Sequence, residues 1–119
     1  MHELSLACSV VELVGSELCR HGGGTLRTVE VTVGELSGVD SEAFAYALQM
    51  VLDRSDYAGA RVALTRVSPR SRCRACGAVF APALLYAPCP QCGGYDTRLE
   101  AGQEFRLTSL TVESDEDKP

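Results

Sequence analysis

Hydrophobic residues recur at helical spacing near the start of the chain. Between about residues 3 and 20 they fall three or four positions apart, which predicts a helix with one apolar stripe. A run of three glycines at residues 22 to 24 ends this pattern. Cys8 falls in the stripe and is expected to be a small buried hydrophobic residue. Cys19 has no second cysteine at metal-ligand spacing, so neither cysteine is assigned a metal role. The stripe consists of Leu4, Ala7, Cys8, Val11, Val14, Gly15 and Leu18.

Alternating segments follow the first helix and flank a second one. Valines at every second position predict a strand from Leu26 to Val33, and residues 60 to 67 predict another. Between them, the sequence GELSGVD breaks the first strand and delivers Asp40 or Ser41 as the cap of a helix. The inward stripe of this second helix is Phe44, Ala47, Leu48, Val51 and Leu52.

The last apolar segment, EFRLTSLTVE, does not alternate evenly. Phe105 and Leu107 share one face but Leu110 and Val112 share the other, so we expect a bulge near Thr108 or Ser109. The predicted fold is therefore α+β: two helices on a small three-stranded sheet, with an inserted four-cysteine, zinc-ribbon-like lobe. We divide the chain into residues 1–68 plus 100–113, a metal-binding lobe at 69–99, and an acidic tail at 114–119.

Composition narrows the class of protein. The chain has 119 residues, enough for one compact unit or a small core domain with a metal-stapled appendage. Its formal net charge of −5 disfavours a partner with a phosphate backbone, so nucleic acid is not expected. We expect neither a secretory signal nor a membrane-spanning run. A cytoplasmic location is the default, and thiolates stay reduced there.

Four cysteines form the most specific motif. Cys73 and Cys76 are separated by two residues, as are Cys89 and Cys92, and a glycine follows each pair. A glycine at this position can adopt positive φ, so that backbone N–H groups point at the thiolates. Two such turns predict a four-thiolate site suited to structural Zn²⁺. The alternative is that these cysteines form two disulfides or are core residues without a chemical role. Reduced intracellular proteins use such pairs for metal far more often than for disulfides, so this alternative is disfavoured.

The first residues form a second candidate metal site. Methionine-removing enzymes accept only small second residues, so bulky His2 should keep Met1 in place. The Met1 amine, the His2 amide and the His2 imidazole can then chelate one ion. Glu3 could add a fourth donor through its amide or its carboxylate. Nitrogen-rich, nearly planar coordination favours Ni²⁺ or Cu²⁺ over Zn²⁺. A terminal histidine is, however, usually solvated, and Asp40 is more often a cap than a ligand. His21 is expected to be an exposed cation at a helix end.

Taken together, these motifs resemble the HypA/HybF family of nickel metallochaperones in hydrogenase maturation. The family start is matched by MHELSLA, and its strand, turn and second helix by TVEVTVGELSGVDSEAFAYALQMVL. The two zinc half-sites are matched by CRACGAVF and CPQCGG, and the last strand by RLTSLTVE. The resemblance spans nearly the whole chain in collinear order. Only the acidic tail, Cys8 and Cys19 fall outside the pattern.

The resemblance implies a carrier of Ni²⁺ rather than an enzyme. It makes His2 the nickel ligand, with the Met1 amine, Glu3 and Asp40 as weaker candidates. It assigns structural zinc to the four cysteines, Cys73, Cys76, Cys89 and Cys92. The implied recipient is the large-subunit precursor of nickel-iron hydrogenase, and the implied partner is a HypB-type GTPase. Some relatives also serve urease maturation.

Two other classes of protein use similar motifs. A Cys-Pro-x-Cys-Gly turn also occurs in rubredoxin-like electron carriers, but aromatic residues make up only 6% of this chain and most of it lies outside the cysteine lobe. A zinc-ribbon adaptor could bind nucleic acid through Arg70, Arg72 and Arg74. A hydrolase is disfavoured because no histidine lies near the cysteines in the sequence.

Overall fold

The computed structural model describes residues 2–114, and they form two helices and two three-stranded sheets. The predicted α+β class, with two helices on a three-stranded sheet, is confirmed. Met1 and residues 115–119, which include most of the predicted acidic tail, lie outside the described residues. The elements in chain order are α1 (Glu3–Arg20), β1 (Thr25–Gly34), α2 (Ser41–Asp53), β2 (Arg61–Val67), β3 (Arg70–Cys73), β4 (Val79–Phe80), β5 (Thr97–Ala101) and β6 (Phe105–Glu113).

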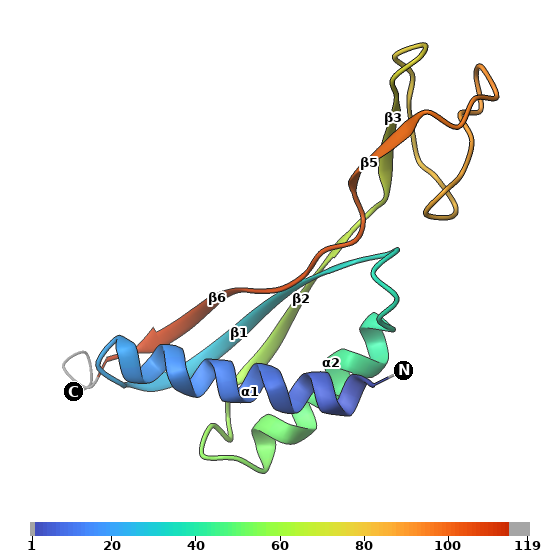
Figure 1. Ribbon diagram of the computed structural model, residues 1–119. Helices are drawn as coiled ribbons and strands as arrows, with labels where there is room; N and C mark the ends of the chain where they lie inside the picture. Colours follow the sequence, from blue (N-terminus) through green and yellow to red (C-terminus); the bar gives the residue numbers. More distant parts are fainter. Residues whose placement is uncertain (1, 115–119) are drawn as a thin grey trace.

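The larger sheet has the strand order β2-β1-β6, and both helices cover the same face of it (Figure 1). Strand β1 lies in the centre, parallel to β2 and antiparallel to β6. Its valines at positions 29, 31 and 33 point toward the helices and are buried. They meet Phe44 and Leu48 of α2, both of which have no exposed surface. Phe44 also packs edge to face against Phe105 of β6, with ring centroids 5.0 Å apart.

The expected bulge in β6 is present and lies at Thr108. Glu30 pairs with Ser109 and its neighbour Val31 pairs with Leu107, so Thr108 is the extra residue. The insertion changes the direction of the following side chains by one position. Leu107 and Leu110 therefore both pack against the core, although an uninterrupted strand would place them on opposite faces.

The apolar stripe of α1 differs from the prediction at Leu4 and Cys8, which are exposed, and at Val10, which is buried but was not predicted. The buried residues of the helix are Ala7, Val10, Val14 and Leu18. Cys8 and Cys19 are exposed, so the expectation that Cys8 is buried is wrong. Successive residues of a helix are rotated by about 100° around its axis, and Ala7 already occupies the position that faces the sheet. Cys8 is thereby turned toward solvent.

Helix α2 begins where the sequence predicted. The Asp40 carboxylate accepts a hydrogen bond from the Ala43 N–H at 3.1 Å, which makes Asp40 the N-cap. The helix ends at Asp53, and its interior residue Leu52 is fully buried. Neither helix in residues 2–114 combines the length and hydrophobicity that crossing a bilayer requires.

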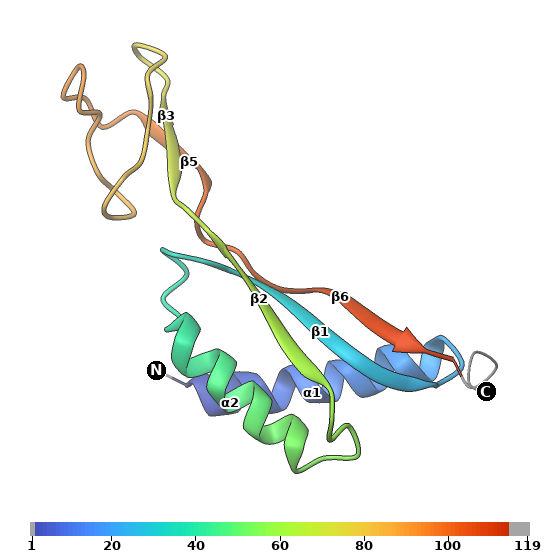
Figure 2. The same cartoon turned by 180° about the vertical axis from the view of Figure 1, so that it is seen from behind.

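The smaller sheet, β4-β3-β5, belongs to a lobe that projects from the core (Figures 1 and 2). The chain enters the lobe after β2 and returns through β6, and the molecule is 61 Å long but only 19 Å thick. The sequence pattern did not predict these short strands. Strand β5 crosses our boundary between residues 99 and 100, because Ala101 still pairs with Arg70 of β3. The division of the chain into domains stays a prediction.

Candidate metal centres

The four cysteines of the lobe converge on one point. Their Sγ atoms all lie within 4.8 Å of one another. The shortest separations join the two Cys-x-x-Cys turns: Cys73 to Cys92, and Cys76 to Cys89, each at 3.6 Å. Residues that are 13 and 19 positions apart in the chain are thus brought together as the spacing predicted.

Both cysteine pairs lie on turns of the same construction. In the first turn the Gly77 N–H donates to the Cys73 carbonyl at 2.8 Å, and in the second the Gly93 N–H donates to the Cys89 carbonyl at 2.8 Å. Gly77 and Gly93 have φ of 79° and 74°, values that a side chain would strain. The first cysteine of each turn is buried and the second is exposed. Each glycine therefore lets the chain reverse tightly enough to present two sulfur atoms.

The distances fit a tetrahedral metal ion and not disulfides. A disulfide requires sulfur atoms about 2.05 Å apart, far closer than the 3.6 Å seen for both cross pairs. Zinc binds thiolates at about 2.3 Å, so the edges of a tetrahedral site are about 3.8 Å long. Four thiolates with no fifth donor leave no open coordination position. The donor set therefore fits a closed, structural Zn²⁺ site.

The electrostatics of the cluster favour a cation at its centre. The N–H of Cys92, followed by that of Gln91, stabilises the Cys89 thiolate and lowers the pKa of Cys89 to about 7. The Ala78 N–H also favours the Cys76 thiolate, but burial and the three neighbouring sulfurs outweigh it and raise the pKa of Cys76 to about 12. Four thiolates cannot all ionise side by side unless a cation offsets their repulsion.

The second candidate site lies at the start of α1. The Glu3 carboxylate accepts a hydrogen bond from the Asp40 N–H at 3.3 Å, which joins the first residues to the cap of α2. His2 is exposed at the N-cap position of α1, and its carbonyl accepts from the Leu6 N–H at 2.9 Å. His2, Glu3 and Asp40 are therefore neighbours, whereas the Met1 amine lies outside the described residues. Their role in nickel binding stays a prediction.

The other histidine is far from this group. His21 follows the last residue of α1, and the 1.5 Å rise per residue places it about 28 Å from His2 along the helix axis. Its Nε2 atom lies 3.6 Å from the Glu17 carboxylate, which also pairs with Arg20. His21 and His2 therefore cannot bind the same ion.

A turn between β1 and α2 contacts the segments that join the lobe to the core, a relationship that sequence reasoning missed. The Gly34 N–H donates to the Glu104 carbonyl at 2.6 Å, and the Leu36 N–H donates to the Gly102 carbonyl at 2.7 Å. The Glu35 N–H donates to the Val67 carbonyl at 3.0 Å. The chain joins the lobe to the core at Val67 and again at residues 102–104, which we call the linking strands. Both are thus hydrogen-bonded to the segment that leads to Asp40.

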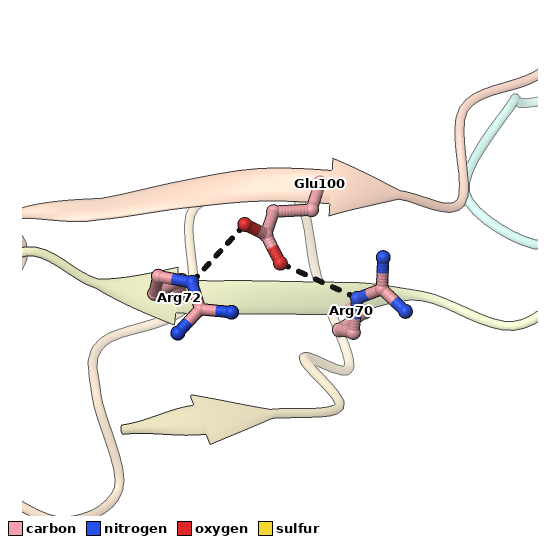
Figure 3. Close-up of polar contacts among 3 residues, drawn as sticks. All are labelled: Arg70, Arg72 and Glu100. Carbon is pink, nitrogen blue, oxygen red and sulfur yellow. Dashed lines mark hydrogen bonds and ion pairs between the residues drawn. The ribbon is translucent and has the colours of Figure 1, made fainter. Parts of the chain in front are cut away.

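Part of the basic cluster in the lobe is paired with an acid that sequence reasoning did not single out. Arg70 and Arg72 donate from Nε to the two oxygens of Glu100 at 3.3 and 3.1 Å (Figure 3). The hydrogen bond from Arg72, together with the charges of both guanidinium groups, holds the pKa of Glu100 below its ordinary value. Two of the three arginines offered to nucleic acid are thus partly neutralised.

Comparison with known proteins identifies the family. Residues 1–112 match the family described as hydrogenase/urease nickel incorporation, metallochaperone. The chain belongs to the HypA family. The hydrogenase maturation factor HypA of Chlorobaculum tepidum is 35% identical over 113 residues, which cover 95% of this chain and all of that protein. The corresponding protein of Geotalea uraniireducens is 37% identical over the same coverage.

Solved structures of HypA proteins share the fold. A solution structure of HypA superposes with a TM-score of 0.69 at 27% identity, covering 97% of this chain and 98% of that one. The solution structure of the Ni metallochaperone HypA from Helicobacter pylori gives 0.66 at 27% identity, covering 97% of this chain and all of that one. The resemblance inferred from the sequence motifs is thereby confirmed. HypA membership favours a nickel metallochaperone over the rubredoxin-like carrier and the nucleic-acid adaptor.

Proposed function

We propose that this chain carries Ni(II) at its N-terminus and delivers it to the large-subunit precursor of nickel-iron hydrogenase. The proposed ligand is His2, through its imidazole and its backbone amide, with the Met1 amine, Glu3 and Asp40 as weaker contributors. Support comes from family membership and from the hydrogen bond between the Asp40 N–H and the Glu3 carboxylate, which places Glu3 beside the start of α2. A HypB-type GTPase is the proposed partner, and urease maturation proteins are further recipients to test.

Release of the cargo follows from the chemistry of the proposed ligands. A backbone amide binds nickel only when it is deprotonated, so protonation competes directly with the ion. His2 and Glu3 lie at the N-terminal end of α1, and a partner that moves Glu3 away from Asp40 would loosen the site. We propose that delivery takes place in the cytoplasm and involves no catalysis by this chain.

In the lobe we propose a structural zinc ion held by Cys73, Cys76, Cys89 and Cys92. The ion would supply the positive charge that four adjacent thiolates need, and it would hold the two turns together. An iron ion in the same thiolates would give red protein, so metal analysis and colour distinguish the two. Zinc, unlike iron, leaves the protein colourless.

A nickel titration tests the proposed carrier. Tag-free, zinc-loaded protein should take up one nickel ion, and His2→Gln, whose bulky second residue keeps Met1 in place, should abolish this uptake. The matched control is His21→Gln, which removes the second of the two histidines from the opposite end of α1 and should bind nickel as the native protein does. Equal nickel uptake by the native protein and His2→Gln would overturn the proposed site.

A further inference from the structure

One face of the lobe sheet presents exposed arginines next to an apolar side chain on its edge strand. Across the three strands, Val79 of β4 pairs with Arg72 of β3, and Arg72 pairs with Arg98 of β5, so the three side chains lie side by side. Arg70 and Glu100 adjoin them (Figure 3). All five residues are exposed, although the Glu100 side chain is partly covered between the two arginines. We call this surface the basic face, and it consists of Arg70, Arg72, Val79, Arg98 and Glu100.

The charge on the basic face is not balanced within the chain. Arg70 and Arg72 share the single carboxylate of Glu100, and Arg98 has no ion-pair partner within residues 2–114. Residues 69–101, which include all of β5, carry four arginines, one aspartate and one glutamate, a formal charge of +2, whereas the other residues of the chain together carry −7. Zinc with four thiolates would contribute −2 and leave the lobe neutral overall, so the positive charge is confined to the basic face, where three arginines meet one glutamate.

The composition of this surface is typical of a protein interface. Arginine is enriched at interfaces and among the residues that dominate binding energy. Val79 is 49% exposed although it lies within a strand. An apolar side chain at the edge of a row of guanidinium groups fits an acidic surface that presents one apolar side chain at its margin. Nucleic acid would gain from the arginines but not from Val79.

The lobe and the proposed nickel ligands lie on the same side of the molecule. In both views the lobe and the start of α1 lie on the same side of the molecule, and the end of β6 lies at the opposite end (Figures 1 and 2). A protein bound to the lobe can therefore extend toward His2. The turn from Gly34 to Asp40 occupies the space between, and it is hydrogen-bonded to both linking strands.

We propose that the basic face is the docking surface for the protein that receives nickel, through an acidic patch with an apolar side chain at its margin. This inference rests on the proposed function. Docking on the lobe holds the recipient beside the N-terminus while the nickel ligands themselves remain available for exchange. Affinity for the recipient and affinity for nickel thus belong to separate surfaces of one chain.

The test compares two charge reversals of equal size. Tag-free, zinc-loaded protein is titrated with purified hydrogenase large-subunit precursor, and Arg98→Glu is measured beside Arg61→Glu. Arg61 is an exposed arginine at the start of β2, away from the lobe. We expect Arg98→Glu to weaken docking on the order of tenfold and Arg61→Glu by less than about threefold. Added salt should weaken the native complex, and Val79→Ser should weaken it as well.

Separate measurements distinguish a failure of the docking inference from a failure of the proposed function. Zinc content and nickel uptake of Arg98→Glu should match those of the native protein, and Arg98→Gln serves in its place where the reversal disturbs the lobe. Equal docking by Arg98→Glu and Arg61→Glu would overturn the inference, as would tighter binding of a labelled single-stranded RNA than of the precursor. Absence of nickel uptake by the native protein would instead overturn the proposed function on which the inference rests.

Discussion

Gly34 and Gly102 cross in direct contact where the lobe joins the core. A Cβ atom at Gly34 would lie 2.1 Å from the carbonyl oxygen of Gly102, and one at Gly102 would lie 2.8 Å from the Cα atom of Pro69. These neighbours are backbone atoms, which cannot rotate away as the end of a side chain can. Both residues must therefore be glycine for the Gly34–Leu36 segment to hydrogen-bond with both linking strands.

The first prediction is that Gly34→Ala destabilises this junction. The added methyl group must push apart two backbones that are hydrogen-bonded to each other, and we expect the free energy of unfolding to fall by about 2–3 kcal/mol. Chemical denaturation measures the change. Gly15→Ala is the control, because Gly15 is helical and a Cβ there meets only the Tyr57 hydroxyl at 3.1 Å. Equal stability of Gly34→Ala and native protein would contradict the prediction.

The elements that the sequence predicted are those with a local signal. The stripe of α2, the alternation of β1 and the broken alternation around Thr108 all lie within a dozen residues, and each was placed correctly. Strand β4 has only two residues, too few for any alternation. The error at Cys8 arose because several apolar residues compete for the buried side of α1, and only the tertiary packing decides among them.

The features of the candidate sites also divide into those with a local sequence signal and those without one. The spacing of the cysteines is local within each turn, and the glycine after each pair marks its geometry, so their convergence could be predicted. The contact between Glu3 and Asp40 joins residues 37 positions apart and has no local signal. The same holds for Glu100 between two arginines and for the crossing of Gly34 and Gly102, since each depends on which strands become neighbours.

A second prediction concerns acid stability at the junction. The N–H groups of Glu104 itself and of Gly102 stabilise the Glu104 carboxylate and lower its pKa below 4.5. Because the folded pKa is lower than the unfolded one, this contribution is complete above the unfolded pKa and is lost as the pH falls from about 4.5 through the folded value. Glu104→Gln should therefore show a flatter loss of stability on the acid side.

The measurement for this prediction is the free energy of unfolding of both proteins between neutral and acid pH. Glu12→Gln is the control, because Glu12 is exposed on α1 and its carboxylate makes no hydrogen bond or ion pair within residues 2–114. This control should follow the native curve. A native curve parallel to that of Glu104→Gln throughout would show that the Gly102 hydrogen bond contributes nothing to acid sensitivity.

A third prediction separates the cysteines of the lobe from those of α1. Cys89→Ser should lose the bound zinc and leave the lobe sensitive to proteases, because metal-binding free energy is folding free energy in such small units. Cys8→Ser should keep both the metal and the resistance, since Cys8 is exposed on the helix. Metal analysis and limited proteolysis measure the two effects. Native-like protease resistance in zinc-free Cys89→Ser would show that the lobe folds without metal.

The last prediction distinguishes the two roles of Asp40. As the cap of α2 it needs only a side-chain oxygen to accept the Ala43 N–H, so Asp40→Asn should keep the stability that Asp40→Ala loses, about 1 kcal/mol. As a contributor to the nickel site it needs its negative charge, and both variants should bind nickel several-fold more weakly. Denaturation and nickel titration of the same samples separate the two effects. Nickel binding that stays native in Asp40→Asn and falls only in Asp40→Ala would mean that Asp40 positions the terminus through the helix cap and contributes no charge to the ion.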